Sequence, residues 1–167
     1  MISRIILDTG PLLDLLLYRF WSEQSRPVDE NVLICRKQFN VGPEQLSRFL
    51  GNCQGITFVP GVFVEVGRIA RDILRHSTQR GISMAPFWRF TIRELKQMGV
   101  DERWTKFLSL DRKLIEELGP TDAALIRCAH EAGEERTPIL THDEHLRGRC
   151  RREGVSCMVT SEILRWL

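Results

Sequence analysis

The sequence predicts an α/β protein with three layers, α/β/α, in which helices cover both faces of a mostly parallel sheet of four to five strands. Short apolar runs alternate with longer stretches whose apolar residues repeat at helical spacing. The first run, Ile5 to Leu7, is apolar at every position, as expected for a strand buried on both faces of a parallel sheet. With 167 residues, the chain is long enough for a full core, and we expect residues 1–167 to form a single domain.

In the first half of the chain, two strands alternate with three helices. Residues 19–43 have no clear period and are expected to form a long, partly ordered connection. Within it, the apolar piece 32–35 suits either a strand or a helix. The expected elements are a strand at 5–7, a helix at 12–18, a helix at 43–53, a strand at 56–59 and a helix at 62–79.

The second half begins with another long connecting region, 81–118, which is mostly helical. Pro86 suggests a break in it, and Trp88 and Trp104 are expected to be packing residues. The expected elements are helices at 92–98 and 104–118, a helix with Thr121 as its N-cap, a strand at 138–141, a helix at 144–153, a strand at 155–159 and a short helix capped by Ser161.

Composition excludes several classes of protein. A hydrophobic share of 43% argues against a disordered chain, and a net charge of +2 gives no global basic surface for non-specific DNA binding. Five cysteines without a C-x-x-C pair favour free thiols over disulfides or zinc. Asp8 and Asp14 interrupt the only apolar run near the N-terminus, so we expect neither a signal peptide nor a membrane span, and a cytoplasmic location.

Four acidic residues are predicted to meet at the carboxyl edge of the sheet. Asp8 and Asp143 each follow a buried strand directly, and Glu65 and Asp122 each lie in the first turn of a predicted helix. In a parallel sheet with crossover helices these positions share one edge, where open α/β sheets bind ligands. Each acid alone is explained as a helix cap or as a charge that favours a helix N-terminus. Four such explanations would have to hold together, so a common site is the better interpretation.

Such a cluster needs positive charge. Carboxylates that lie close together repel one another, and without a counter-ion some of them bind protons. Mg²⁺ or Mn²⁺ removes this repulsion, because these ions take oxygen ligands and keep waters for substrate phosphates. We therefore expect metal-assisted phosphodiester hydrolysis. His142 and His145 flank Asp143, but two histidines without a third nearby ligand make a transition-metal site the weaker interpretation.

The acids belong to four short motifs that span nearly the whole chain. The motifs are Ile6-Leu7-Asp8-Thr9-Gly10-Pro11-Leu12, Val59-Pro60-Gly61-Val62-Phe63-Val64-Glu65, Thr121-Asp122-Ala123-Ala124-Leu125 and Leu140-Thr141-His142-Asp143. No single motif is specific, but in this order and spacing they resemble the successive motifs of the PIN-domain family of metal-dependent ribonucleases.

The resemblance implies an endoribonuclease that cuts an RNA substrate and leaves a 5′ phosphate and a 3′ hydroxyl. It implies Asp8, Glu65, Asp122 and Asp143 as ligands of Mg²⁺ or Mn²⁺, with the Thr141 hydroxyl holding a carboxylate or a water. His145 stands where relatives often carry another aspartate, so the number of ions is left open. Many PIN domains are toxins paired with an antitoxin protein and are often homodimers, whereas others are stand-alone nucleases. The connections at 19–43 and 81–118 are longer than a compact toxin needs.

Other interpretations stay beside this one. Arg147 and Arg151 share a face of the predicted helix after Asp143 and suit RNA phosphates, but a solvated helix face explains them equally well. An aspartyl phosphatase would need a second aspartate where Gly10 stands. A catalytically silent PIN-like scaffold for RNA or protein would be marked by the loss of an acid, and all four are present. Asp14, on the first helix, is expected to be structural.

Overall fold

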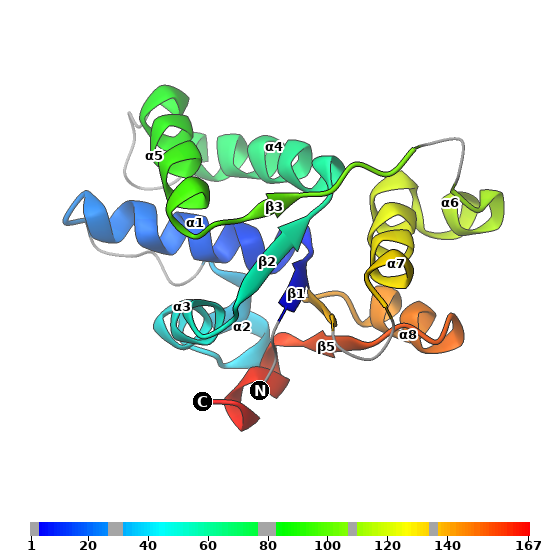
Figure 1. Cartoon of the computed structure of the whole chain (residues 1–167). Helices are drawn as coiled ribbons and strands as arrows, with labels where there is room; N and C mark the ends of the chain where they lie inside the picture. Colours follow the sequence, from blue (N-terminus) through cyan, green and yellow to red (C-terminus); the bar gives the residue numbers. More distant parts are fainter. Residues whose placement is uncertain (1–3, 27–31, 77–82, 107–109, 134–136) are drawn as a thin grey trace.

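The computed structural model of the chain describes residues 4–26, 32–76, 83–106, 110–133 and 137–167. At its centre is a five-stranded sheet in the order β3-β2-β1-β4-β5 (Figure 1), and each pair of neighbouring strands is parallel. The predicted α/β class and parallel sheet are confirmed. The strands are β1 (Arg4–Leu7), β2 (Gly55–Phe58), β3 (Asp101–Glu102), β4 (Ile139–Thr141) and β5 (Cys157–Val159).

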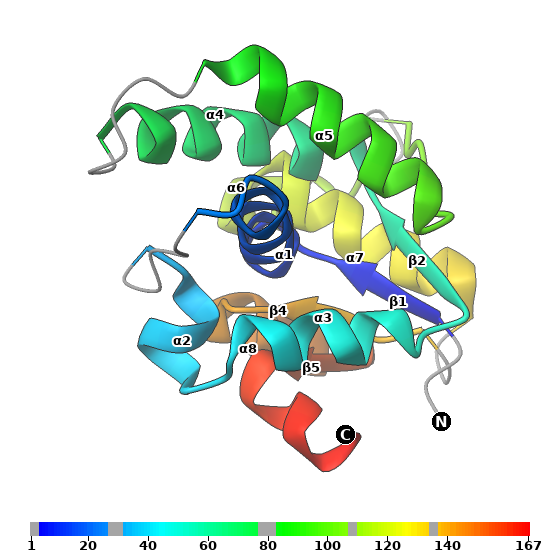
Figure 2. The same ribbon diagram turned by 90° about the vertical axis from the view of Figure 1, so that its left-hand side faces the viewer.

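Helices cover both faces of the sheet and complete the three layers (Figures 1 and 2). One face carries α1 (Thr9–Glu23), α2 (Ile34–Phe39), α3 (Pro43–Gly51), α4 (Pro60–His76) and α5 (Met84–Gln97). The other carries α7 (Pro120–Ala132) and α8 (Glu144–Arg152), and α6 (Arg112–Leu118) packs against α7. The chain ends in the 3₁₀ helix η2 (Thr160–Arg165). Because the connections change faces between β3 and β4, the strand order reverses beside β1.

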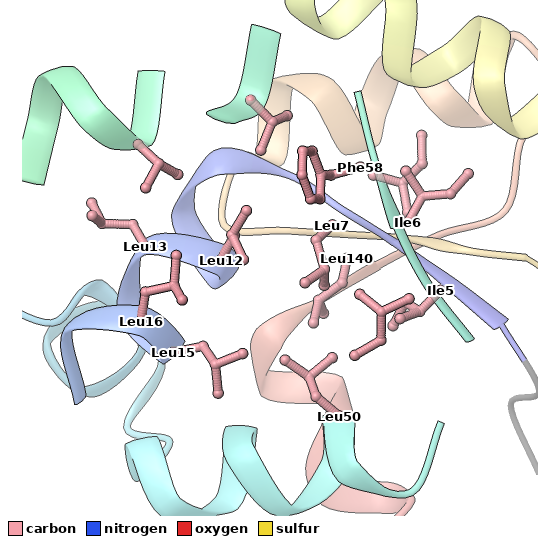
Figure 3. Packing of buried hydrophobic residues seen from close by; sticks show 14 of the residues in the cluster. Ile5, Ile6, Leu7, Leu12, Leu13, Leu15, Leu16, Leu50, Phe58 and Leu140 are labelled. Atoms are coloured by element: carbon pink, nitrogen blue, oxygen red, sulfur yellow. The ribbon is translucent and has the colours of Figure 1, made fainter. Parts of the chain in front are cut away.

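The core is built around β1 and α1. Ten of the fifteen residues of α1 are buried, because this helix contacts β4 of the sheet and also the helices α2, α3, α4 and α5. Figure 3 shows Leu12 and Leu15 of α1 beside Leu7 and Leu140 of the sheet and Leu50 of α3. With α1 packed in this way, the end of β1 at Asp8 is held in a rigid setting.

The first long connection is more ordered than predicted. α1 continues to Glu23, and the apolar piece 32–35 leads into α2, so the helical option is the correct one. The Asp14 side chain accepts hydrogen bonds from the backbone N–H of Ile34 (3.0 Å) and Cys35 (2.6 Å) and so caps α2 from another helix. This cap is a tertiary contact, which local sequence patterns do not reveal. Residues 27–31 of the connection lie outside the described residues.

The region 81–118 departs most from the predictions. Pro86 does not break a helix, since it lies in the first turn of α5, where a missing N–H costs nothing. The helix expected at 104–118 is described only as α6, and Trp104 is 78% exposed rather than packed. Trp88 does pack, with its ring 5.2 Å from that of Phe63. The edge strand β3 was not predicted, because it has only two residues and both are exposed.

Several helix ends also differ from the predictions. Thr121 is not the N-cap of α7, because Gly119 takes that position with a φ of +86° and the helix begins at Pro120. Val159, rather than Ser161, precedes the last helical segment, which is a 3₁₀ helix. Within the described ranges, no helix combines the length and apolarity that crossing a bilayer requires. All five cysteines are free thiols.

Candidate active site

A cleft of about 840 Å³ lies at the carboxyl ends of β1 and β4, the strands between which the order reverses. Its lining includes Asp8, Glu65, Asp122 and Asp143. The structure therefore brings together all four acids that the strand and helix pattern predicts at one edge. Each reaches the cleft from a different element: the end of β1, helix α4, helix α7 and the end of β4.

Asp8 is the most firmly positioned acid. The residue is 8% exposed, and the Thr9 backbone N–H donates to Oδ1 (2.5 Å) while the Thr141 hydroxyl donates to Oδ2 (2.5 Å). Burial raises the pKa of Asp8 above its ordinary value, and the Glu65 charge adds to this, whereas the two hydrogen bonds act in the opposite direction. Asp8 is thus both the N-cap of α1 and a fixed charge in the cleft.

Thr141 connects two of the acids. While its hydroxyl donates to Asp8, its oxygen accepts a hydrogen bond from the Asp143 backbone N–H (2.8 Å). Asp143 in turn caps α8, accepting from the His145 N–H (2.6 Å). The Thr141 side chain is fully buried, so this hydroxyl has no competing water. The chain around β4 is therefore held to the end of β1 at the cleft.

Glu65 is held by two threonine hydroxyls that sequence reasoning missed. Thr9 donates to Oε2 (2.8 Å) and Thr121 donates to Oε1 (2.7 Å). Glu65 was predicted in the first turn of its helix, but α4 begins at Pro60, so Glu65 lies beyond that turn. A favourable interaction of its charge with the helix N-terminus therefore explains this acid less well. A Cβ on Gly61 would lie 2.7 Å from the Thr121 hydroxyl, so this glycine lets α4 and α7 approach.

Asp122 lies in the first turn of α7, as predicted, and its pKa is strongly affected by its surroundings. Its pKa is raised to about 7, first by burial and then by the charges of Asp8, Asp143 and Glu65. Lys and Arg are missing from the described residues that line the cleft. The four acids therefore lack a cationic partner there, and Asp122 takes a proton near neutral pH instead.

We expect Asp122→Asn to stabilise the metal-free protein at pH values above about 7. The folded pKa of about 7 lies above the ordinary 3.8, so the folded protein binds this proton more tightly than the unfolded chain. Wild-type stability then falls as the pH rises from about 4 through about 7. The amide avoids this loss, and after allowance for the partial exposure of Asp122 we expect a gain of about 1–2 kcal/mol.

Urea unfolding of both proteins in EDTA, at about pH 5 and about pH 8, measures the effect. The stability difference between variant and wild type should grow toward the higher pH. A difference that is the same at both pH values would contradict the electrostatic account of Asp122.

The donor set at the cleft suits a hard divalent cation. Carboxylates and hydroxyls are the oxygen ligands that Mg²⁺ and Mn²⁺ prefer. Among the described residues, no three side chains of His, Cys, Asp or Glu lie close enough together to ligate one ion directly. Asp8 and Glu65 instead use their oxygens to accept hydrogen bonds from threonines. This arrangement fits an ion held partly through water, as Mg²⁺ commonly is.

A second feature missed by sequence reasoning is the environment of His142. Its Nε2 lies 3.0 Å from Oδ2 of Asp14, and its Nδ1 lies 2.6 Å from the Thr160 hydroxyl. The ring stacks on Phe39 with centroids 5.2 Å apart. A Cβ on Gly10 would clash with the His142 ring, so glycine there lets the ring pack against the start of α1. As predicted, Asp14 is structural: it is fully buried and joins His142 to α2.

The two arginines of α8 have different environments. Arg147 pairs with Glu162 (2.9 Å) and Glu144 (3.3 Å), and its side chain is 20% exposed. Arg151, one turn later, is exposed. Neither is among the described residues that line the cleft, and both belong to α8, the first helix after Asp143.

Comparison with known proteins adds no relatives: no family model matches the chain, and no curated protein matches it significantly.

Proposed function

We propose that the protein is a Mg²⁺- or Mn²⁺-dependent endoribonuclease that hydrolyses phosphodiester bonds of RNA. The observation that carries the proposal is the meeting of four carboxylates from four elements in one cleft, where burial and mutual repulsion raise the pKa of Asp122 to about 7. Acids arranged in this way are better explained by a cation and its phosphate substrate than by helix capping. The likeness of the four motifs to PIN domains supports the same activity.

In this proposal Asp8, Asp122 and Asp143 hold the ion, directly or through water, and Glu65 completes the site or orients the attacking water. When bound, the ion supplies Lewis-acid stabilisation of the charge that develops on the phosphoryl and leaving oxygens. Thr141 keeps Asp8 and Asp143 in place, while Thr9 and Thr121 fix the Glu65 carboxylate. Water adds to phosphorus, the bond to the 3′ oxygen breaks, and the products carry a 5′ phosphate and a 3′ hydroxyl. Arg147 and Arg151 are proposed to hold RNA phosphates beside the cleft.

The partners and location are part of the proposal. The described surface exposes apolar side chains, among them Val64 (71%), Ile92 (51%) and Trp104 (78%). An antitoxin protein or a second copy of the chain would cover such side chains. Free cysteines suit a reducing compartment, which supports a cytoplasmic location.

A catalytically silent RNA- or protein-binding scaffold is the second candidate. It is favoured by the same exposed apolar side chains, and by the hydrogen bonds that already engage the oxygens of Asp8 and Glu65.

Incubation of end-labelled RNA with the purified protein tests the proposed activity. We expect cleavage in Mn²⁺ or Mg²⁺ and none in EDTA, with products that a 5′-phosphate-dependent exonuclease degrades. The Asp122→Asn protein, purified in parallel, controls for contaminating nucleases and should be inactive. Binding of RNA without cleavage in either metal would favour the scaffold, and equal cleavage by Asp122→Asn would overturn the proposed mechanism.

A further inference from the structure

One part of the cleft wall, formed by α2, is mostly apolar and has no acidic residue among those that line the cleft. α2 contributes three residues to it: Ile34, Gln38 and Phe39. Gln38 is exposed, whereas Ile34 and Phe39 are half-buried. The further apolar side chains that line the cleft are Leu13, Ile69 and Leu118. A metal site alone does not require an apolar wall. The wall therefore suggests that the ligand has an apolar part as well as the part that binds the metal.

The aromatic ring in this wall is held in place in advance. Phe39 stacks on His142 at an interplanar angle of 25°, and both ring nitrogens of His142 are engaged, by Asp14 and by Thr160. Asp14 also caps α2, so one buried carboxylate fixes both the helix that carries Phe39 and the ring on which Phe39 rests. An aromatic surface that is already rigid loses little entropy when a flat ligand stacks on it.

We propose that this wall binds a nucleobase of single-stranded RNA next to the scissile phosphate, with Phe39 as the stacking surface and Gln38 contacting the base edge. The proposal rests on the proposed function and deepens it. A nucleotide has two unlike parts, an anionic phosphate and a flat aromatic base. The acidic side of the cleft suits the phosphate once a cation is bound, and the apolar side suits the base. In a duplex the bases are stacked within the helix, so this site selects single strands.

Phe39 variants test the proposal in cleavage assays with short single-stranded RNA in Mn²⁺. We expect Phe39→Ala to raise KM by about tenfold or more, as the loss of a base-stacking aromatic does, with kcat changed by no more than about threefold. Phe39→Tyr keeps the ring and should restore KM. Trp166→Ala removes an aromatic side chain that is 52% exposed and lies outside the cleft lining, and should leave KM unchanged.

A binding readout keeps the proposal separate from catalysis. Oligonucleotides with 2-aminopurine at successive positions are titrated with each protein in Ca²⁺, and stacking on Phe39 should quench the fluorescence at one position in wild type and Phe39→Tyr. Phe39→Leu, which keeps apolar contact with His142, should lose the quenching while its melting temperature stays close to that of wild type. This variant covers the case in which Phe39→Ala fails to fold.

The outcomes distinguish the two proposals. If Phe39→Leu shows the quenching and the KM of wild type, the proposed base site is wrong even if RNA is cleaved. The same holds if the protein binds duplex and single-stranded RNA with equal affinity. Quenching that depends on Phe39, in a protein that cleaves no RNA, would support the base site and overturn the nuclease.

Discussion

Asp8→Asn is expected to abolish Mn²⁺ binding and RNA cleavage together. Asp8 lies at the end of the central strand, and its two carboxylate oxygens are aimed by Thr9 and Thr141. The amide keeps the size of the side chain but removes its charge, which is the property that a hard cation needs. Because the loss of outer-shell partners alone costs about 10- to 100-fold in metal affinity, the loss of a ligand should exceed about 100-fold.

Calorimetric titration of both proteins with Mn²⁺ and with Mg²⁺ measures the effect. Asp111→Asn serves as the matched control, because Asp111 is also an N-cap but is exposed at the start of α6 and does not line the cleft. It should bind metal as wild type does. Equal, weak binding by wild type and Asp8→Asn would mean that the acids are helix caps, and the scaffold would become the better account.

Asp14→Ala is expected to destabilise the protein by about 3–5 kcal/mol. The Asp14 carboxylate is fully buried and lies within hydrogen-bond distance of three groups: the N–H of Ile34, the N–H of Cys35 and Nε2 of His142. Truncation leaves these polar groups buried without their partner and also removes the cap of α2, and each such loss is costly.

Urea denaturation followed by circular dichroism measures this loss. Asp111→Ala, which removes the exposed cap of α6, should cost only about 1 kcal/mol. A loss of less than about 1 kcal/mol in Asp14→Ala would show that water or rearranged side chains replace the carboxylate.

Local patterns predicted the parts of the site that depend on a single element. Asp8 and Asp143 follow short apolar runs that are typical of buried strands, and parallel strands place their carboxyl ends at one edge. The threonine contacts of Glu65 and the ring contacts of His142 were not predictable in this way. Thr9 and Thr121 each reach Glu65 across 56 residues, and the His142 contacts depend on how α1, α2 and η2 pack.

The errors in the fold have a similar origin. β3 is a two-residue edge strand with no apolar residue to reveal its pairing with β2, and Trp104 was expected to pack on its residue type alone. α2 depends on the distant cap from Asp14 more than on its own sequence, since none of its own side chains provides an N-terminal cap. Each error therefore occurs where tertiary contacts, rather than local preference, decide the conformation.

The bond between Asp8 and Thr141 joins residues 133 positions apart. β1 pairs with β2 on one side and with β4 on the other, and β4 is synthesised long after β1 and β2. A nascent chain that ends just before β4 therefore contains the acids of α4 and α7 without the threonine that orients Asp8. Under the proposed function, the nuclease centre cannot form in a nascent chain that lacks β4, so cleavage of RNA has to wait until that strand has been synthesised and paired with β1.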